Sequence, residues 1–502
     1  MKIEMENQLF GIATICMCTV VFYLSLKSYQ HKNFDRAILL LLLGGLILRV
    51  FISTDMYLHH WDERYHALVA KNLMKNPLKP MLYDLPLLDF DFRDWSRNHI
   101  WLHKQPIPLW IMAASLKLFG VNVIALRIPS IFLSLVGVYC TYNIGKILFS
   151  RKVGFIASFL SAIHGLILEL TSGRIATDHI DVFFLSFITI SVYFGLKFAS
   201  SKKIVFNILC GFFMALAILS KWLPAMIIFP IWFLGMLQFK NFTWKQLSIH
   251  FTTLLIINII LVLPWQLYIY YHYPLEAQWE SSFNFKHLTE ALQGHGKPFY
   301  YHFNRMRIIF GEIIYLPILW ILYKAISTRR PYKYYLLLIW IFIPYLFFSF
   351  AKTKMQGYII FTAPAFFILT GIFISALPVL LSRLNLSYLK LVVVIAFIGL
   401  PIRYSIERLK PFQKKSRHQS WIANLIQLED KKNSKQVIFN TKYPIEIMFY
   451  SDIIAYEALP SNPKLRELYD QGFSIIIDQH QSLPDEVKKL EFVEIVSLHT
   501  VQ

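Results

Sequence analysis

The sequence predicts an all-α protein that crosses a membrane many times. Of its 502 residues, 56% are apolar and 16% are charged, whereas soluble domains carry about 25% charged residues. Aromatic residues make up 16% of the chain, and the mean hydropathy is +0.48. This balance excludes a disordered chain and argues strongly against a soluble enzyme.

Apolar stretches of roughly 17–25 residues are long enough to cross a bilayer, and the chain contains about twelve of them. Their approximate limits are 9–26, 37–53, 123–149, 153–172, 179–196, 204–220, 223–238, 248–271, 308–323, 334–350, 357–377 and 389–405. The first stretch lacks a small-residue cleavage pattern, so we expect it to stay as an anchor. Residues 1–405 are therefore predicted to form one transmembrane domain.

The distribution of charge predicts the orientation. The net charge of +20 would suggest nucleic acid as a partner of a soluble protein, but here the cations gather in alternate connections between spans, at 27–36, 151–152, 197–203, 240–245, 324–333 and 383–390. Cytoplasmic loops are enriched in Lys and Arg. We therefore expect no nucleic acid partner, an extracytoplasmic N-terminus, and polar chemistry on the extracytoplasmic side. The four cysteines lie in apolar runs and carry no expected function.

The first outer loop, 54–121, is too apolar to be a solvated connection. Tyr65, Leu68, Val69 and Leu73 recur at helical spacing, so 62–75 reads as an amphipathic helix. A second helix is expected over 106–119. Helices of this kind lie in the membrane interface, where these two would form a platform.

The tail, 406–502, is predicted to be a small extracytoplasmic α/β domain. Short β-like runs occur at 436–440, 445–450, 474–478 and 492–497, and helical patterns at 419–431 and 462–471. The segment is long enough to have a core of its own.

Polar residues at the outer ends of spans are the candidate functional groups. Asp62 and Glu63 are acids close to lipid, which is a frequent sign of function, although acids also favour a helix N-terminus. Asp178 follows Arg174 by four residues, a spacing that also suits a simple ion pair. Lys221 ends a span, where a lone cation can also reach the interface without a further role.

Ordered motifs carry a family resemblance. They lie at 62–65 (DERY), 101–106 (WLHKQP), 118–122 (LFGVN), 125–130 (ALRIPS), 173–178 (GRIATD), 219–221 (LSK), 263–265 (LPW), 294–301 (GHGKPFYY) and 352–358 (KTKMQGY). Together they resemble the successive motifs of GT-C glycosyltransferases, in the branch that contains protein O-mannosyltransferases and lipid A aminoarabinose transferases. The resemblance implies a GT-C type fold and an inverting transfer of a hexose or pentose from a polyprenyl-phosphate donor. The acceptor would be a protein, lipid A or another envelope glycan at the outer face of the membrane, and no nucleotide would be needed.

The resemblance also implies roles for individual residues. Asp62 matches the family's general base, Glu63 is the adjacent acid, and Asp178 would be a second acid, a role that Asp181 could share. Lys221 matches a lysine that binds the donor phosphate. Other candidate phosphate ligands are Lys104, Arg174, Lys297, Lys352 and Lys354.

His103 and His287 resemble ligands of a divalent metal such as zinc, which imidazole suits. His287 and the nearby His295 could equally be ordinary loop histidines. His103 stands where the aminoarabinose transferases carry an acid, and the span at 9–26 is an addition to the pattern expected of that branch.

The alternative function is a transporter or flippase of lipid-linked sugars. Such a protein would carry ionisable residues within its spans, and Glu169 and Glu312 are the acids that suit it best. For either function the expected setting is a bacterial inner membrane.

Overall fold

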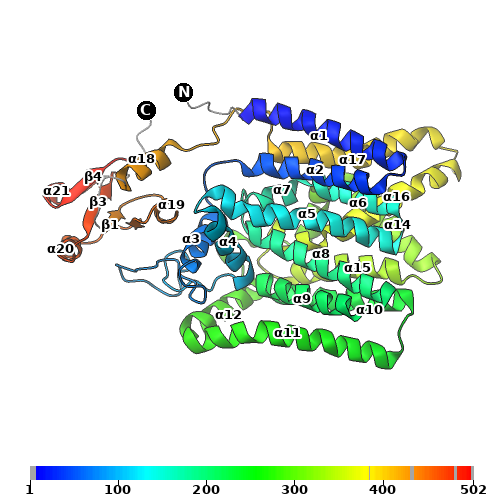
Figure 1. Ribbon diagram of the computed structural model, residues 1–502, viewed down its shortest axis with the longest axis horizontal. Helices are drawn as coiled ribbons and strands as arrows, with labels where there is room; N and C mark the ends of the chain where they lie inside the picture. Colours follow the sequence, from blue (N-terminus) through cyan, green and yellow to red (C-terminus); the bar gives the residue numbers. More distant parts are fainter. Residues whose placement is uncertain (1–6, 384, 430–434, 480–482, 499–502) are drawn as a thin grey trace.

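Long apolar helices lie side by side in a bundle, with a small domain at one end (Figure 1). The computed structural model describes residues 7–383, 385–429, 435–479 and 483–498. Within these residues eight helices are long and apolar enough to cross a membrane. They are α1 (Asn7–Gln30), α2 (Phe34–Ser53), α5 (Val123–Leu148), α8 (Asp178–Ser201), α9 (Ile204–Lys221), α11 (Trp244–His272), α15 (Tyr332–Phe350) and α16 (Ala363–Arg383) with the preceding 3-10 helix η4 (Gln356–Thr362). The predicted class, a polytopic helical membrane protein, is confirmed.

Two further pairs of consecutive helices are together apolar enough to cross a membrane but are bent at a break between them. Helices α6 (Arg151–Ile163) and α7 (Gly165–Thr171) meet at 53°, and α13 (Tyr301–Phe310) meets η3 (Glu312–Ile314) and α14 (Tyr315–Ser327) at 111°. His164 stands at the first bend, and its Nε2 lies 2.9 Å from the carbonyl of Ile309 beside the second. The two bends therefore contact each other inside the bundle.

Against the expectation of about twelve spans, eight helices of the described chain are long and apolar enough to cross a membrane, or ten if each bent pair is one span. The stretch 223–238 forms η1 (Leu223–Ile227) and α10 (Ile228–Phe239), which together are apolar but shorter than the helices counted as spans. Trp222, with a φ of +62°, ends the preceding helix α9. The stretch 389–405 lies in α17 (Lys390–Leu409), which carries charged residues in its last turns.

Loop 54–121 contains both expected helices, α3 (Asp62–Leu73) and α4 (Pro106–Phe119). They lie at the end of the bundle nearest the small domain, close to α12 (Pro274–Thr289) (Figure 1). The 3-10 helix η2 (Leu292–Gly294) follows α12. The N-terminal end of α1 lies at this same end, which we call the α3 end.

The small domain contains a four-stranded parallel sheet in the order β2-β1-β3-β4. Its strands are β1 (Gln436–Phe439), β2 (Ile454–Ala455), β3 (Ser474–Asp478) and β4 (Val493–Val496), and its helices are α18 (Ser420–Glu429), α19 (Pro444–Tyr450), α20 (Asn462–Asp470) and α21 (Asp485–Lys488). The strand predicted at 445–450 is wrong, because this run is helix α19. Proline is well suited to the first position of a helix, and a short apolar run does not distinguish strand from buried helix by its period.

Hydrogen bonds join the small domain to loop 54–121. The hydroxyl of Tyr450 accepts a hydrogen bond from the backbone N–H of Leu58 at 2.8 Å, and Lys71 donates to the carbonyls of Met448 and Ser451 at 2.9 and 2.7 Å. The domain therefore holds the outer side of α3, the helix that carries Asp62.

Candidate active site

Asp62 and Lys104 form an ion pair at the α3 end of the bundle. Asp62 begins α3, Lys104 precedes α4 by two residues, and Asp62 Oδ2 lies 3.5 Å from Lys104 Nζ. The two side chains are 20% and 19% exposed, so solvent reaches both. Burial acts to raise the pKa of Asp62, but Lys104, His66 and His103 more than offset this and lower it to about 2. Asp62 is consequently ionised at neutral pH.

A second ion pair joins the start of α8 to the end of α9. Lys221 contacts the buried carboxylate of Asp181, whose other oxygen accepts a hydrogen bond from the Thr177 hydroxyl. Thr177 adopts a left-handed backbone conformation, with φ +66°. Gly357 packs against this carboxylate so closely that a Cβ there would collide with it and with Thr177. The left-handed backbone at Thr177 and the absence of a side chain at Gly357 thus leave room for the Asp181 carboxylate and its hydrogen bond.

The two ion pairs are close enough to interact electrostatically. Lys104 is within range of Asp181, and the phenol of Tyr358 is within range of both Asp62 and Asp181. The ring of Tyr358 also lies 4.8 Å from Lys221 Nζ. Asp62, Lys104, Asp181, Lys221 and Tyr358 are called the paired-ion cluster below. It unites three predicted site residues with Asp181 and with Tyr358, which sequence reasoning did not single out.

Asp178 is paired with a histidine that sequence reasoning missed. His66 lies one helical turn after Asp62, and its Nδ1 is 2.9 Å from Asp178 Oδ1. Both side chains are fully buried, and neither His66 Nε2 nor Asp178 Oδ2 has a hydrogen-bond partner within the described chain. The i,i+4 spacing of Asp62 and His66 on an amphipathic helix was the available signal.

Glu63 lies in a separate, buried setting. Arg127 donates to its two oxygens at 2.7 and 2.9 Å, His179 Nε2 lies 3.1 Å from Oε1, and the backbone N–H of His59 donates to Oε2 at 2.7 Å. A Cβ at Gly173 would collide with this side chain. Burial acts to raise the pKa of Glu63, but Arg127 and His179 hold it well below its usual range. Both carboxylate oxygens of Glu63 are hydrogen-bonded to Arg127, His179 or His59. Glu63 therefore links α3 to α5 and α8 and is not part of the paired-ion cluster.

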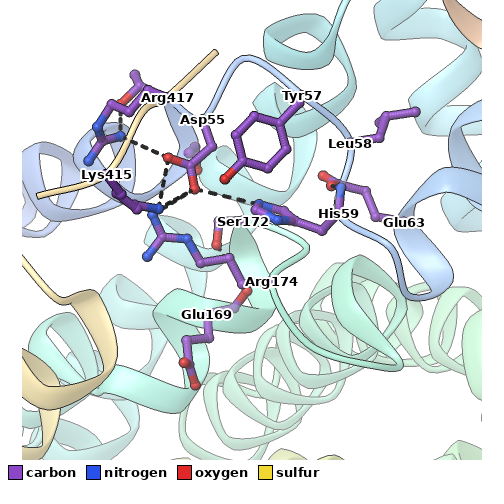
Figure 2. Close-up of polar contacts among 12 residues, drawn as sticks. Asp55, Tyr57, Leu58, His59, Glu63, Glu169, Ser172, Arg174, Lys415 and Arg417 are labelled. Atoms are coloured by element: carbon purple, nitrogen blue, oxygen red, sulfur yellow. Dashed lines mark hydrogen bonds and ion pairs between the residues drawn. The ribbon is translucent and has the colours of Figure 1, made fainter. Parts of the chain in front are cut away.

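Arg174 belongs to a cluster around Asp55, drawn in Figure 2. Asp55 is fully buried and contacts Arg174 at 2.9 Å, Lys415 at 2.9 Å and Arg417 at 3.4 Å. Arg174 and Lys415 lower the pKa of Asp55 against the effect of burial. The alternative Arg174–Asp178 ion pair therefore does not form, because Arg174 is paired with Asp55 and Asp178 with His66. Sequence reasoning missed Asp55, an isolated acid at the end of a predicted span.

Lys297, Lys352 and Lys354 lie where the turn before η4 meets the loop after α12. The backbone N–H groups of Thr353 and Lys354 donate to the carbonyls of His287 and His295, both at 3.0 Å. Lys354 is buried and donates to the carbonyls of Lys297 and Ala351, whereas Lys352 is exposed. The ammonium group of Lys354 thus donates its hydrogen bonds to backbone carbonyls of this junction.

The two predicted metal ligands lie near a shared carboxylate. His103 Nδ1 is 3.3 Å from Glu280 Oε2, and the His287 ring is within electrostatic range of His103 and Glu280. Burial is the main cause that lowers the pKa of both histidines, which favours the neutral form that binds metals. However, no group of three or more His, Cys, Asp or Glu among the described residues is close enough to hold an ion, so we derive no reaction step through a metal.

The acids that suit a transporter both contact α17. Glu169 forms an ion pair with Arg408, and Glu312 accepts a hydrogen bond from Tyr404. Both carboxylates thus have partners from one neighbouring helix.

Sequence comparison confirms the family resemblance. Residues 103–268 match the family model described as dolichyl-phosphate-mannose-protein mannosyltransferase. An undecaprenyl phosphate-alpha-4-amino-4-deoxy-L-arabinose arabinosyl transferase of Shewanella sediminis is 28% identical over 286 residues, which are 53% of this chain and 49% of that protein. The chain spans about half the length of the curated transferases it matches.

Solved structures share the fold over most of the chain. ArnT from Cupriavidus metallidurans, bound to undecaprenyl phosphate, aligns with a TM-score of 0.61 at 14% identity and covers 86% of this chain and 87% of its own. The archaeal oligosaccharyltransferase AglB from Archaeoglobus fulgidus, in complex with an inhibitory peptide and a dolichol-phosphate, aligns with a TM-score of 0.56 at 14% identity, over 84% of this chain and 64% of its own. The expected GT-C type fold is therefore confirmed.

Proposed function

Because the chain is related to the polyprenyl-phosphate-sugar glycosyltransferases of the GT-C superfamily, we propose that it is itself such an enzyme. It transfers a hexose or pentose from a polyprenyl-phosphate donor, with inversion, to a protein, lipid or glycan acceptor. The reaction takes place at the extracytoplasmic face of a bacterial inner membrane. The observation that carries the proposal is the paired-ion cluster, which gathers two lysines and two carboxylates at one end of a GT-C type bundle.

Lys221 and Lys104 supply the charge that a lipid phosphate requires. Negative charge grows on the phosphate as its bond to the sugar breaks, and preorganised cations are the most effective way to stabilise it. Each lysine is held by a carboxylate, Asp181 or Asp62, and each is about one-fifth exposed. The donor phosphate replaces solvent at these two ammonium groups, and Asp181 keeps Lys221 in place from its buried side.

Asp62 faces the acceptor. With a pKa of about 2 it is fully ionised but a weak base, and a general base works best when its pKa is near the working pH. When Lys104 turns toward the donor phosphate, Asp62 loses its main favourable charge and its basicity rises. Donor binding in this way prepares Asp62 to accept the proton of an acceptor hydroxyl. An acceptor that is already an ionised phosphate needs no base, and Asp62 then orients it.

The remaining predicted groups have supporting roles. Asp178, through His66, fixes the face of α3 behind Asp62. A divalent ion held by His103 and His287 stays a prediction, and elemental analysis of the purified protein against a His103→Ala/His287→Ala variant tests it.

Transfer is tested with the purified full chain in detergent. The donor is a radiolabelled undecaprenyl-phosphate sugar, the acceptor is an envelope extract, and wild type is compared with Asp62→Asn and Lys221→Met. Matched controls are Asp470→Asn and Lys240→Met, which alter exposed residues outside the site. We expect a labelled product with wild type and both controls, and loss of that product in both site variants. Nuclear magnetic resonance of the product then reports its anomeric configuration.

Two results contradict the proposal. One is a product that forms equally with Asp62→Asn and Lys221→Met. The other is donor binding without transfer to any extract, together with movement of the labelled lipid across reconstituted vesicles, which would identify a flippase.

A further inference from the structure

A cleft of about 720 Å³ opens between two helix turns. These turns, α1 to α2 and α5 to α6, lie at the end of the bundle opposite to the α3 end (Figure 1). One turn joins α1 to α2; it contributes Lys32, and the first turn of α2 contributes Asp35. The other joins α5 to α6, whose adjoining residues contribute Lys146 and Arg151. The two turns are far from the paired-ion cluster, and the proposed transfer reaction uses none of their residues.

The cleft carries an excess of unpaired positive charge. Three cations, Lys32, Lys146 and Arg151, share it with a single carboxylate, Asp35. Across the described chain none of these four side chains forms an ion pair or a hydrogen bond with another residue. The contrast with the α3 end is sharp, because the cations of the paired-ion cluster and the Asp55 cluster are all held by carboxylates.

Aromatic rings hold two of the cations at the cleft. The Arg151 guanidinium lies 4.6 Å from the centre of the Phe34 ring, and Lys146 Nζ lies 5.8 Å from that of Tyr142. Contacts of this kind restrict the side chain but leave its N–H donors unused. Guanidinium donors match the oxygens of a phosphate.

The wall of the cleft continues into the membrane. It includes Ile38, Leu39 and Leu42 of α2 and Tyr139 of α5. Leu39 is 69% exposed and Tyr139 is 44% exposed, although both belong to membrane-spanning helices. These side chains therefore face lipid. A ligand that used the whole cleft would place an anionic group against the cations and an apolar chain along this wall.

We propose that the cleft binds an anionic glycerophospholipid of the surrounding membrane. Its phosphate lies among Lys32, Lys146 and Arg151, and an acyl chain lies along Leu39, Leu42 and Tyr139. Basic pockets between spans at the cytoplasmic side are known to bind such head groups, and the positive-inside rule assigns this end of the bundle to the cytoplasm. The proposal does not depend on the proposed transfer activity.

Native mass spectrometry of the detergent-solubilised full chain tests it, with phosphatidylglycerol as the probe. Wild type is compared with Lys32→Ala/Lys146→Ala/Arg151→Ala and with a matched control, Lys202→Ala/Lys203→Ala/Lys245→Ala. The control removes the same charge from exposed lysines outside the cleft. Each cation that contacts the lipid phosphate contributes roughly a five-fold change in affinity, so the cleft variant should bind about 100-fold more weakly than wild type. The control lysines do not line the cleft, so the control should bind within a few-fold of wild type. Leu42→Trp, which fills the cleft without changing its charge, should also weaken binding.

Three further probes identify the ligand. Phosphatidylethanolamine, undecaprenyl phosphate and inorganic phosphate should each bind the cleft more weakly than phosphatidylglycerol. Equal binding of phosphatidylglycerol by wild type and the cleft variant would overturn the proposal. So would a preference of the cleft for undecaprenyl phosphate, or competition by inorganic phosphate as effective as that by the lipid.

Discussion

Asp62 and Glu63 are neighbours in the chain, yet their carboxylates occupy different environments. Asp62 is partly exposed and lies 3.5 Å from Lys104, whereas Glu63 is fully buried against Arg127 at 2.7 Å. Successive residues of a helix point about 100° apart. The first turn of α3 therefore directs Asp62 toward Lys104 and Glu63 toward Arg127. Asp62 is available to a substrate, while Glu63 ties α3 to α5 and α8.

The first prediction concerns transfer by Asp62→Asn. The amide retains the shape of the side chain but cannot accept a proton or balance Lys104. We expect the transfer rate to an acceptor hydroxyl to fall by about 10²–10⁴-fold, with the melting temperature close to that of wild type because the residue is partly exposed. Initial rates and melting curves on the same preparations check this. A rate above one-tenth of wild type would exclude the assigned role.

The second prediction concerns the pH profile. A carboxylate with a lowered pKa stays active above that pKa and loses activity as the pH falls through it, so the acid limb of kcat/KM that belongs to Asp62 should lie near pH 2. Lys104→Met removes the main favourable charge while burial still raises the pKa. The limb should therefore move upward, toward the ordinary range of about 4. Lys104→Arg should keep it low, and identical profiles for all three proteins would contradict the assignment.

The third prediction separates the two tasks of Lys221. Lys221→Met leaves the buried Asp181 carboxylate unpaired, and breaking a buried pair in this way costs about 3–5 kcal/mol of stability. The double variant Lys221→Met/Asp181→Asn removes that unpaired charge. It should regain most of the melting temperature but still fail to bind the donor. Recovery of both properties would show that Lys221 acts only on the fold.

The fourth prediction concerns Glu63. Glu63→Ala leaves Arg127 buried without its partner and should cost about 3–5 kcal/mol, while Glu63→Gln keeps the volume and should cost less. Because the folded pKa lies below the unfolded value of about 4.3, this contribution is present above that value and lost as the pH falls. Folded Glu63→Gln protein should transfer sugar at a rate near that of wild type. A large loss of transfer rate without a loss of stability would contradict this prediction and indicate a catalytic role for Glu63.

The fifth prediction concerns the segment between α17 and α18. Asp55→Asn removes the carboxylate that holds Lys415 and Arg417. Trypsin should then cleave after these residues faster than in wild type, while Lys435→Gln, in the small domain, should leave the rate unchanged. Mass spectrometry of the fragments locates the cut. Unchanged cleavage would mean that the other bonds of Arg417 hold the segment without Asp55.

Local patterns made much of this structure predictable. Helical spacing located α3 and α4, and short β-like runs located β1, β3 and β4. Short-range patterns failed where two structures suit the same residues, as in α19.

The pairing of charges was not predictable from one sequence. The motifs named Asp62, Lys104 and Lys221, but the partners of Lys221, Asp178 and Arg174 come from distant segments. These partners are Asp181, His66 and Asp55, and each is brought to its cation or acid only by the packing of helices. Spacing of four residues suggested that Arg174 meets Asp178, and tertiary packing instead gave each a partner of its own.

The bond between Arg417 and Asn7 joins residues that are 410 positions apart, at 2.6 Å. Arg417 also donates to Phe51 and Thr54 at the end of α2. During synthesis α1 and α2 enter the membrane long before residue 417 leaves the ribosome. The contacts of Arg417 with α1 and α2 therefore form only after every intervening span has been inserted. Their formation is a late step of assembly in the cell.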